Sequence, residues 1–373
     1  MTPRKILVVS QFTFAIILVI STIIIVQQIK YAQERNAGYD KNNLAYIFIE
    51  GDIMKNYQLI KNDLMNSGTA IAISQTMAPL TQSWSSGMSL NWQGKDPNTR
   101  PTFDRSTTDG GLIKMAGLEL VQGRDIDINT YPTDSTACII NESAAKIMNF
   151  KNPIGQLVFD DPINWHIVGV IKDFILQSPY DKTRPIIFKG PKYGRNVMNI
   201  KFNSRNSTAQ NLASTEKILK KYNPAYPFEY HFIDDEYAKK FSDQQLIGTL
   251  AGLFAGLTIF ISCLGLFGLA TYMAESRIKE VGVRKILGAS VTNIATLLSK
   301  DFVTLVIISI FIASPIAWYF MKQWLLSFDY RIHISWYVFA SAGLTAIIIA
   351  LFTVSFQAIK AAIANPVKSL RSE

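Results

Sequence analysis

Four long apolar runs constrain the fold of this chain more than any other feature of its sequence. They cover Ile6–Val26, Leu246–Met273, Phe302–Phe320 and Trp336–Phe356. A helix needs roughly 20 apolar residues to cross the hydrocarbon layer of a membrane, and each run meets that length or nearly so. The four runs contain no Asp, Glu, Lys or Arg, which argues against a proton or ion pathway through them. We therefore expect four spanning helices, one before and three after a long polar region.

The positions of the basic residues predict the orientation of these helices. Arg4 and Lys5 precede the first run, and Lys360, Lys368 and Arg371 follow the last one. Short flanking segments that are rich in Lys and Arg remain on the cytoplasmic side of a membrane. Both termini are therefore expected in the cytoplasm. The first run is longer than the apolar core of a signal peptide and is not followed by a small-residue cleavage site, so we expect it to be retained.

This orientation divides the chain into three parts. Residues 1–29 form the first spanning helix, residues 30–243 an extracytoplasmic domain, and residues 244–373 a domain with three further spans. Within the last part, residues 274–300 form a cytoplasmic loop. The segment Asp234–Phe241 is expected to continue as a helix into the second run. The formal net charge of +9 does not predict nucleic-acid binding, because the chain has no block of like charge and no interleaving of aromatic and basic residues.

The extracytoplasmic region has the pattern of an α/β domain with two βαβ-like units. The first unit has strands at Leu44–Ile49 and Ala70–Gln75 with a helix at Lys55–Asn66 between them. The second has strands at Val197–Asn203 and Phe228–Ile233 around a helix at Thr208–Tyr222. Such helices must be buried against a sheet, so we expect the two units to share one. The intervening residues, about 80–190, are rich in turn residues and predict an inserted subdomain.

Several local features can be predicted within the insertion. Gly123 suits a turn that needs a positive φ. Asn141 is a good N-cap for a helix over Glu142–Met148. The apolar run Ile167–Ile171 is typical of a buried strand.

The sequence contains no recognisable catalytic motif. It has no G-x-x-x-x-G-K-[ST] phosphate loop, no G-x-S-x-G and no H-E-x-x-H, so the chain is not expected to hydrolyse ATP or to bind a cofactor. Its three histidines are scattered, and its two cysteines are expected in different compartments, so neither a metal site nor a disulfide is predicted. Arg124, Asp125 and Asp173 have no nucleophile or metal cluster nearby in the sequence, and we interpret them as structural.

Charged residues are concentrated between the second and third runs, in the polar segment Glu275–Ser290 (ESRIKEVGVRKILGAS). Glu280 and Arg284 form a favourable i,i+4 pair if the segment is helical. Ser290 can cap a helix that leads into the third run. The charges admit two interpretations. They set only the orientation of the protein in the membrane, or they form a docking element for a cytoplasmic partner.

Three glycines in the second run form a small-residue face. Gly248, Gly252 and Gly256 recur every four residues, a spacing that lets helix backbones approach closely. The face can pair two protomers or pack within one bundle, and the sequence does not choose between these alternatives.

The polar segment resembles the cytoplasmic loop of FtsX-like, MacB-type ABC transporter permeases of the type VII class, whose pattern is E-x-G-x-R-K-x-L-G-A-S. The matching residues are Glu280, Gly282, Arg284, Lys285, Leu287, Gly288, Ala289 and Ser290. Three further stretches resemble the MacB-type periplasmic domain in order. They are Gly117–Asp125, Ile140–Gly155 and Ile167–Phe174. Some relatives, from Bacteroidota-like lineages, carry two such units in one chain, and this chain resembles the second unit alone.

The resemblance implies a permease of the bacterial inner membrane that works by mechanotransmission. A separate ABC ATPase would bind ATP, dock on the polar segment and move the helices and the periplasmic domain during efflux or extraction of a substrate. The implied docking residues are Glu275, Arg277, Glu280, Gly282, Arg284 and Lys285. A second permease unit is implied as partner, as a homodimer or as the other half of a longer permease, and a periplasmic adaptor or hydrolase is a further possible partner. The alternative is a transmembrane sensor or a scaffold that regulates an extracytoplasmic enzyme or a signalling partner. The sequence names no substrate.

Overall fold

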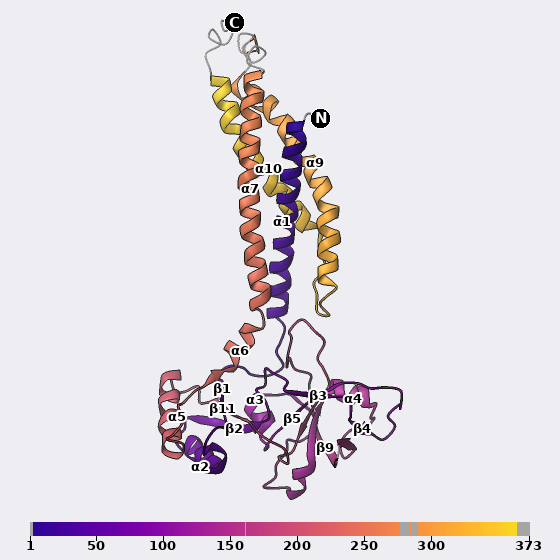
Figure 1. Ribbon diagram of the computed structural model, residues 1–373, viewed down its shortest axis with the longest axis vertical. Coiled ribbons are helices and arrows are strands. Elements are labelled where there is room, and N and C mark those ends of the chain that lie inside the picture. The colour runs from indigo at the N-terminus through magenta and orange to yellow at the C-terminus, as the bar shows by residue number, and fades with distance from the viewer. Residues whose placement is uncertain (1–2, 161, 277–282, 285–289, 364–373) are drawn as a thin grey trace. The chain divides into compact units, whose positions relative to one another are not determined.

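The computed structural model describes residues 3–160, 162–276, 283–284 and 290–363 (Figure 1). The chain divides into two compact units. The membrane unit comprises Met1–Gln33 and Ser242–Glu373, and the outer unit comprises Glu34–Phe241. The sequence placed these boundaries at residues 29/30 and 243/244.

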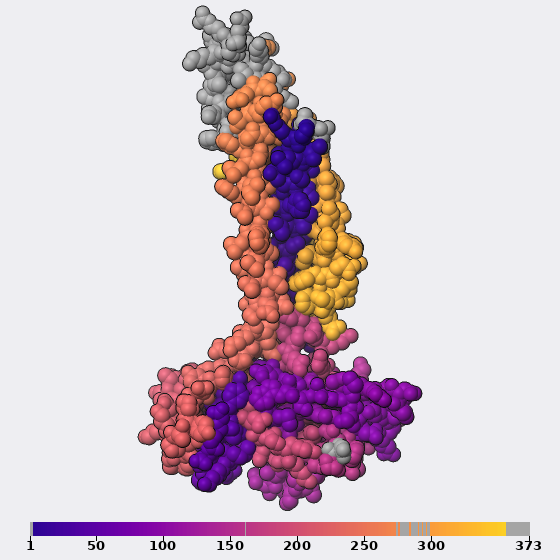
Figure 2. Space-filling model, viewed as in Figure 1, coloured from indigo at the N-terminus to yellow at the C-terminus, as the bar shows by residue number. Residues whose placement is uncertain are grey.

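The membrane unit is built from four long helices. They are α1 (Pro3–Gln33), α7 (Ser242–Ser276), α9 (Val291–Leu325) and α10 (Trp336–Ile363). All four are long and apolar enough to cross a membrane, as the sequence predicted. Helix α1 contacts each of the other three and is the most enclosed of them. Figure 2 shows α1, in indigo, beside α7 along the unit. The first span is thus the centre of the bundle and not a peripheral anchor.

A buried glutamine on α1 holds the connection between α9 and α10. The Gln28 side chain is fully buried. Its Nε2 donates to the carbonyl of Tyr330 at 2.7 Å, and its Oε1 accepts from the amide of Ile332 at 3.0 Å. The rings of Tyr31 and Tyr330 stack with centroids 5.4 Å apart. Because both ends of the amide are used, this polar side chain is tolerated inside an apolar bundle.

Segments from the beginning and the end of the outer unit together form one four-stranded sheet. Its strand order is β12-β1-β11-β2, and all neighbouring strands are antiparallel. Its elements are β1 (Leu44–Phe48), α2 (Ile53–Asn66), β2 (Ala70–Thr76), β11 (Val197–Phe202), α5 (Thr208–Tyr222) and β12 (His231–Phe232). The two strands of each predicted βαβ unit are parallel but not adjacent, since a strand of the other unit lies between them. The two units are therefore interleaved in a split βαβ arrangement.

Helices α2 and α5 bury one side of this sheet, with Ile60, Leu64, Ile73, Met198 and Leu219 in the shared core. Strand β12 is shorter than the predicted strand Phe228–Ile233. It pairs only with Ala45 and Tyr46 of β1, and α6 (Ile233–Lys239) follows it directly. The predicted continuous helix from Asp234 into the span is also wrong, because α6 ends at Lys239 and α7 begins at Ser242.

The inserted subdomain contains the second sheet, of eight strands in the described part of the chain. Its order is β3-β5-β10-β7-β9-β8-β4, and β6 pairs with β9. The strands are β3 (Ser85–Gly87), β4 (Asn91–Trp92), β5 (Phe103–Thr107), β6 (Leu120–Gly123), β7 (Ala137–Asn141), β8 (Leu157–Asp160), β9 (Ile163–Ile171) and β10 (Ile186–Lys189). Two short helices, α3 (Leu112–Ala116) and α4 (Glu142–Met148), and a 3-10 turn, η1 (Pro132–Thr136), complete it. These elements lie within the residues predicted as an insertion.

The local predictions for this subdomain are confirmed. The Asn141 side chain accepts from the amide of Ala144 at 3.0 Å and caps α4. Gly123 has a φ of +79°, and a Cβ there would lie 2.1 Å from the carbonyl oxygen of Val168. Only glycine fits this position, because both the backbone conformation and the neighbouring strand exclude a side chain.

Candidate functional site

The polar segment between α7 and α9 is described only at its two ends and around Arg284. Glu275 lies exposed in the last turn of α7, and the Arg284 side chain is also exposed. The remaining predicted docking residues lie outside the described residues; these are Arg277, Glu280, Gly282 and Lys285. A docking role for the segment therefore stays a prediction.

The helices on either side of the polar segment have defined ends. The Ser290 hydroxyl accepts from the amide of Asn293 at 3.2 Å and caps α9 as predicted. At the other side, the guanidinium of Arg4 on α1 lies 4.2 Å from the ring centroid of Tyr272 on α7. A cation over an aromatic face is a favourable contact at the level where a helix leaves the membrane. The beginning of α1 and the end of α7 are thereby held together.

The predicted glycine face lies partly against α1. A Cβ at Gly248 would lie 3.3 Å from Cγ2 of Ile25, and one at Gly252 would lie 3.8 Å from Cγ2 of Thr22. A Cβ at Gly256 would meet no atom of the described residues within 4 Å beyond the backbone of its own helix. Two of the three glycines therefore face a helix of the same chain, which supports packing within one bundle at that end of α7.

A further glycine of α7, Gly265, also lies close to α1, and the sequence did not predict this contact. A Cβ at Gly265 would lie 2.4 Å from Oε1 of Gln11 on α1. Gly265 therefore makes room for a polar side chain on the neighbouring helix. Its spacing from Gly256 does not continue the four-residue repeat, so the sequence contained no signal for this contact.

In the outer unit, Arg124 forms an ion pair that closes a loop. Its guanidinium donates through both terminal nitrogens to the buried Asp134 and lies 3.9 Å from the ring centroid of Tyr131. Burial alone would raise the pKa of Asp134, but hydrogen bonds from Arg124 and from the amide of Asp127 outweigh it and lower that pKa. Both carboxylate oxygens of Asp134 and both terminal nitrogens of Arg124 take part in this pair, which fits a structural role.

The two other acidic candidates also bond to backbone groups. Asp125 accepts from the amides of Ile113 and Ile126, both at 2.8 Å, and burial raises its pKa to about 6. Asp173 accepts from the amide of Ser143 at 3.0 Å and from its hydroxyl at 2.6 Å. Each carboxylate therefore holds a turn or a helix start. No group of His, Cys, Asp or Glu among the described residues could hold a metal ion.

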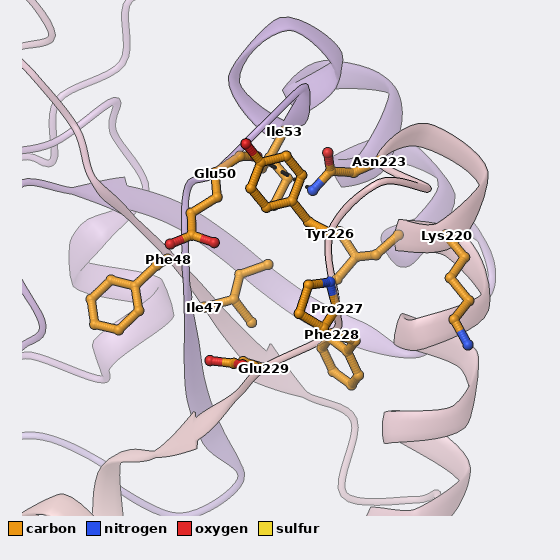
Figure 3. A pocket seen from close by; sticks show the side chains of 11 residues that line it. Ile47, Phe48, Glu50, Ile53, Lys220, Asn223, Tyr226, Pro227, Phe228 and Glu229 are labelled. Atoms are coloured by element: carbon orange, nitrogen blue, oxygen red, sulfur yellow. Dashed lines mark hydrogen bonds between the residues drawn. The ribbon is translucent and has the colours of Figure 1, made fainter.

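An open cleft of the outer unit, which the sequence did not reveal, lies between β1 and the residues that follow α5. The space within it and at its open mouth is about 470 Å³. Ile47, Pro227 and Phe228 give it apolar walls, and Figure 3 shows Ile47 between the carboxylates of Glu50 and Glu229. Nothing in the pattern of either strand distinguishes these residues, because the cleft arises where residues 226–230 diverge from β1.

Two family models match this chain. The MacB-like periplasmic core domain matches residues 6–217, and the FtsX-like permease C-terminal region matches residues 252–366. The macrolide export ATP-binding/permease protein MacB of Aggregatibacter actinomycetemcomitans is 28% identical over 194 residues, which are 48% of this chain and 29% of MacB. The uncharacterized ABC transporter permease YknZ of Bacillus subtilis (strain 168) is 22% identical over 277 residues, 70% of this chain and 68% of YknZ.

Solved structures with a similar outer unit include the periplasmic region of MacB from Actinobacillus actinomycetemcomitans. It has a TM-score of 0.39 at 18% identity and covers 56% of this chain and 96% of that structure. The extracellular domain of YknZ, a transporter from Gram-positive bacteria, has a TM-score of 0.36 at 12% identity. The match covers 51% of this chain and 98% of that structure.

Proposed function

Because the chain belongs to the family of FtsX/MacB-type permeases, we propose that it is the permease subunit of an ABC transporter driven by a separate ATPase. The observation that carries this proposal is the order of the parts. A MacB-like periplasmic core region with one span precedes an FtsX-like region with three spans. The chain contains no phosphate loop, so ATP is bound and hydrolysed by the partner.

The proposed activity is mechanotransmission. The ATPase docks on the polar segment through Glu275, Arg284 and the neighbouring charged residues, and its cycle moves α7 and α9. Helix α7 packs along α1, and these two helices are the ones that continue directly into the outer unit. A change at the polar segment thereby reaches the outer unit through two chain connections.

The topology and the family also support a proposal for the setting of the protein. The protein lies in the inner membrane of a bacterium, with its termini and the polar segment in the cytoplasm and its outer unit in the periplasm. It works with a second permease unit and serves efflux or extraction. The substrate is not identified by any group in the described residues, and a periplasmic adaptor or hydrolase is a further proposed partner.

Affinity purification from native membranes tests this function. We expect a P-loop ATPase to be recovered with the wild-type protein and to be reduced about tenfold with Arg284→Glu, because reversing the charge at a docking surface repels the partner. The matched control is Arg205→Glu, which reverses an exposed arginine of the outer unit and should leave recovery unchanged.

Two other results would contradict the proposal. Recovery of a histidine kinase or an extracytoplasmic hydrolase without any ATPase would favour a sensor or a scaffold. Equal recovery of the ATPase with the wild type and with Arg284→Glu would remove the docking role from the polar segment.

A further inference from the structure

One loop of the inserted subdomain is bound by residues from both ends of the outer unit. The 175–183 loop connects β9 to β10. Arg35 stands two residues after the end of α1, where the chain enters the outer unit. Its Nη1 donates to the carbonyls of Pro179, at 3.0 Å, and Asp181, at 2.9 Å. The entry point of the chain is thereby attached to this loop.

The exit point of the chain is attached to the same loop. Lys240 lies in the short break between α6 and α7. Its ammonium donates to the carbonyls of Leu176, at 2.8 Å, and Gln177, and also to that of Thr81, at 2.7 Å. These three acceptors satisfy the three donors of an ammonium group. Thr81 precedes the first strand of the insertion, so Lys240 bonds both to the residue that leads into the inserted subdomain and to the loop between β9 and β10.

A backbone hydrogen bond and several ring contacts add to these side-chain hydrogen bonds. The amide of Ile175 donates to the carbonyl of Ala37 at 2.8 Å. The ring of Tyr180 lies edge-on to that of Phe241, with centroids 5.9 Å apart. Tyr39 similarly contacts Phe174, at 6.0 Å. Phe241 and Phe174 are each only 2% exposed. The loop is therefore packed against both connections to the membrane helices, and it cannot shift from one of them without losing buried contacts.

Burying the charged ammonium of Lys240 costs free energy, which a residue with a purely stabilising role would avoid. Burial lowers the pKa of its ammonium to about 8, which means that the surroundings disfavour the charge. Its neighbour Lys239 lies largely in solvent, with 68% of its side chain exposed, and pairs with Glu236. The two adjacent lysines therefore differ sharply in their surroundings, and Lys240 is the one whose ammonium is drawn into the outer unit beside the loop carbonyls.

We propose that the 175–183 loop is the element through which displacements of α1 and α7 reach the inserted subdomain, with Arg35 and Lys240 as its positioning residues. This inference rests on the proposed function, because it assigns a path to the movement that a permease of this kind transmits. The loop joins β9 and β10, which flank β7 in the middle of the second sheet. A relative movement of the two helices therefore acts on the centre of that sheet and not on its edge.

The test constrains α1 and α7 and records the response of the loop in the full chain in nanodiscs. A Cβ at Gly248 would lie 3.3 Å from Cγ2 of Ile25, which puts an Ile25→Cys/Gly248→Cys pair within reach of a disulfide. Cys263→Ala is included throughout, and Cys138 is fully buried. Hydrogen exchange of residues 175–183 is compared between the oxidised and reduced forms. We expect oxidation to slow exchange in the loop by about threefold, because the helix ends that hold it move less.

The same comparison with Lys240→Met and with Arg35→Met should show no response of the loop to oxidation, whereas Lys239→Met should behave like the parent. Lys240→Arg should restore part of the response because it keeps a charged donor. Unchanged protection of β1 and β11 shows that each variant is folded. A full response in Lys240→Met, or no response in the parent, overturns the proposal. No ATPase is needed for this experiment, so its failure is distinguishable from failure of the proposed function.

Discussion

The two units of this protein place their apolar side chains in opposite ways. On α7 in the membrane unit, Leu253, Phe254 and Phe260 are each more than half exposed. In the outer unit, Leu64 and Phe103 are fully buried. Large exposed apolar side chains along a helix of this length are stable only in an apolar solvent. The membrane unit therefore has lipid as its surroundings, whereas the outer unit must build its own core.

The polar side chains of the two units also differ in where their hydrogen-bond partners lie. The hydroxyls of Thr249 and Thr258 on α7 donate to carbonyls four residues earlier in the same helix. In the outer unit, Asn199 donates to the carbonyl of Ser74 across the first sheet. A polar group in a membrane must be satisfied by its own segment or by a neighbouring helix, while a folded domain in water can use partners far away in the sequence. The hydroxyls of Thr249 and Thr258 are thus satisfied within their own helix, and a polar side chain of the membrane unit that is bonded to another segment, such as Gln28, lies fully buried in the bundle.

The largest expected effect comes from replacing matched leucines in the two units. Leu64→Ala removes a fully buried side chain from the core between α2 and the first sheet and should cost about 3 kcal/mol of opening free energy in the outer unit. Leu253→Ala, at a position 67% exposed on α7, should cost well under about 1 kcal/mol. Hydrogen exchange of the full chain in nanodiscs measures both. A large loss at Leu253 would show that another protein segment covers that face.

A second comparison between the units concerns charged side chains. The apolar runs of the spans contain none, whereas the outer unit buries several, such as Asp134. Asp134→Asn breaks the ion pair with Arg124 and should cost about 2 kcal/mol at pH 7. The pKa of Asp134 is lowered in the folded state, so its contribution is present above the ordinary value of 3.8 and is lost as the pH falls through the folded pKa. The difference between wild type and variant in chemical denaturation of the outer unit should therefore shrink below about pH 4.

The control for this change is Glu119→Gln. Glu119 pairs with Lys172, but its side chain is 66% exposed, so its loss should cost less than about 0.5 kcal/mol. A difference between Asp134→Asn and wild type that persists undiminished at acidic pH would mean that packing, and not charge, explains the effect.

The smallest effect concerns two glycines on α7. Gly256→Ala meets no atom within 4 Å and should stabilise the helix slightly, by up to about 1 kcal/mol, because alanine is the better helix former. Gly248→Ala gains the same propensity but forces Ile25 to move, so its net effect should be near zero or unfavourable. Thermal stability in nanodiscs measures the difference. If Gly256→Ala is the more harmful change, a second protomer packs on that face.

Local pattern was sufficient for much of the fold. The absence of charge over each apolar run predicted all four spans, and alternation and capping residues predicted β1, α2, α5 and α4 within a few residues. These features depend on residues close in sequence, whose period and end signals are set by backbone geometry. The docking role of the polar segment stays a prediction, because four of its six residues lie outside the described residues. The cleft beside β1 could not be predicted, because it has no periodic signature.

The sequence by itself determined that this protein spans a membrane, which of its parts are helical, and that an α/β domain lies between the first two spans. Only the tertiary structure decided how the two βαβ units interleave, which helix the glycines of α7 face, and that Arg35 and Lys240 bind the same loop. The physical reason is separation along the chain. Arg35 and Pro179 are 144 residues apart, and the partner of a hydrogen-bond donor at that distance is chosen by the packing of whole sheets and helices, which no local period records.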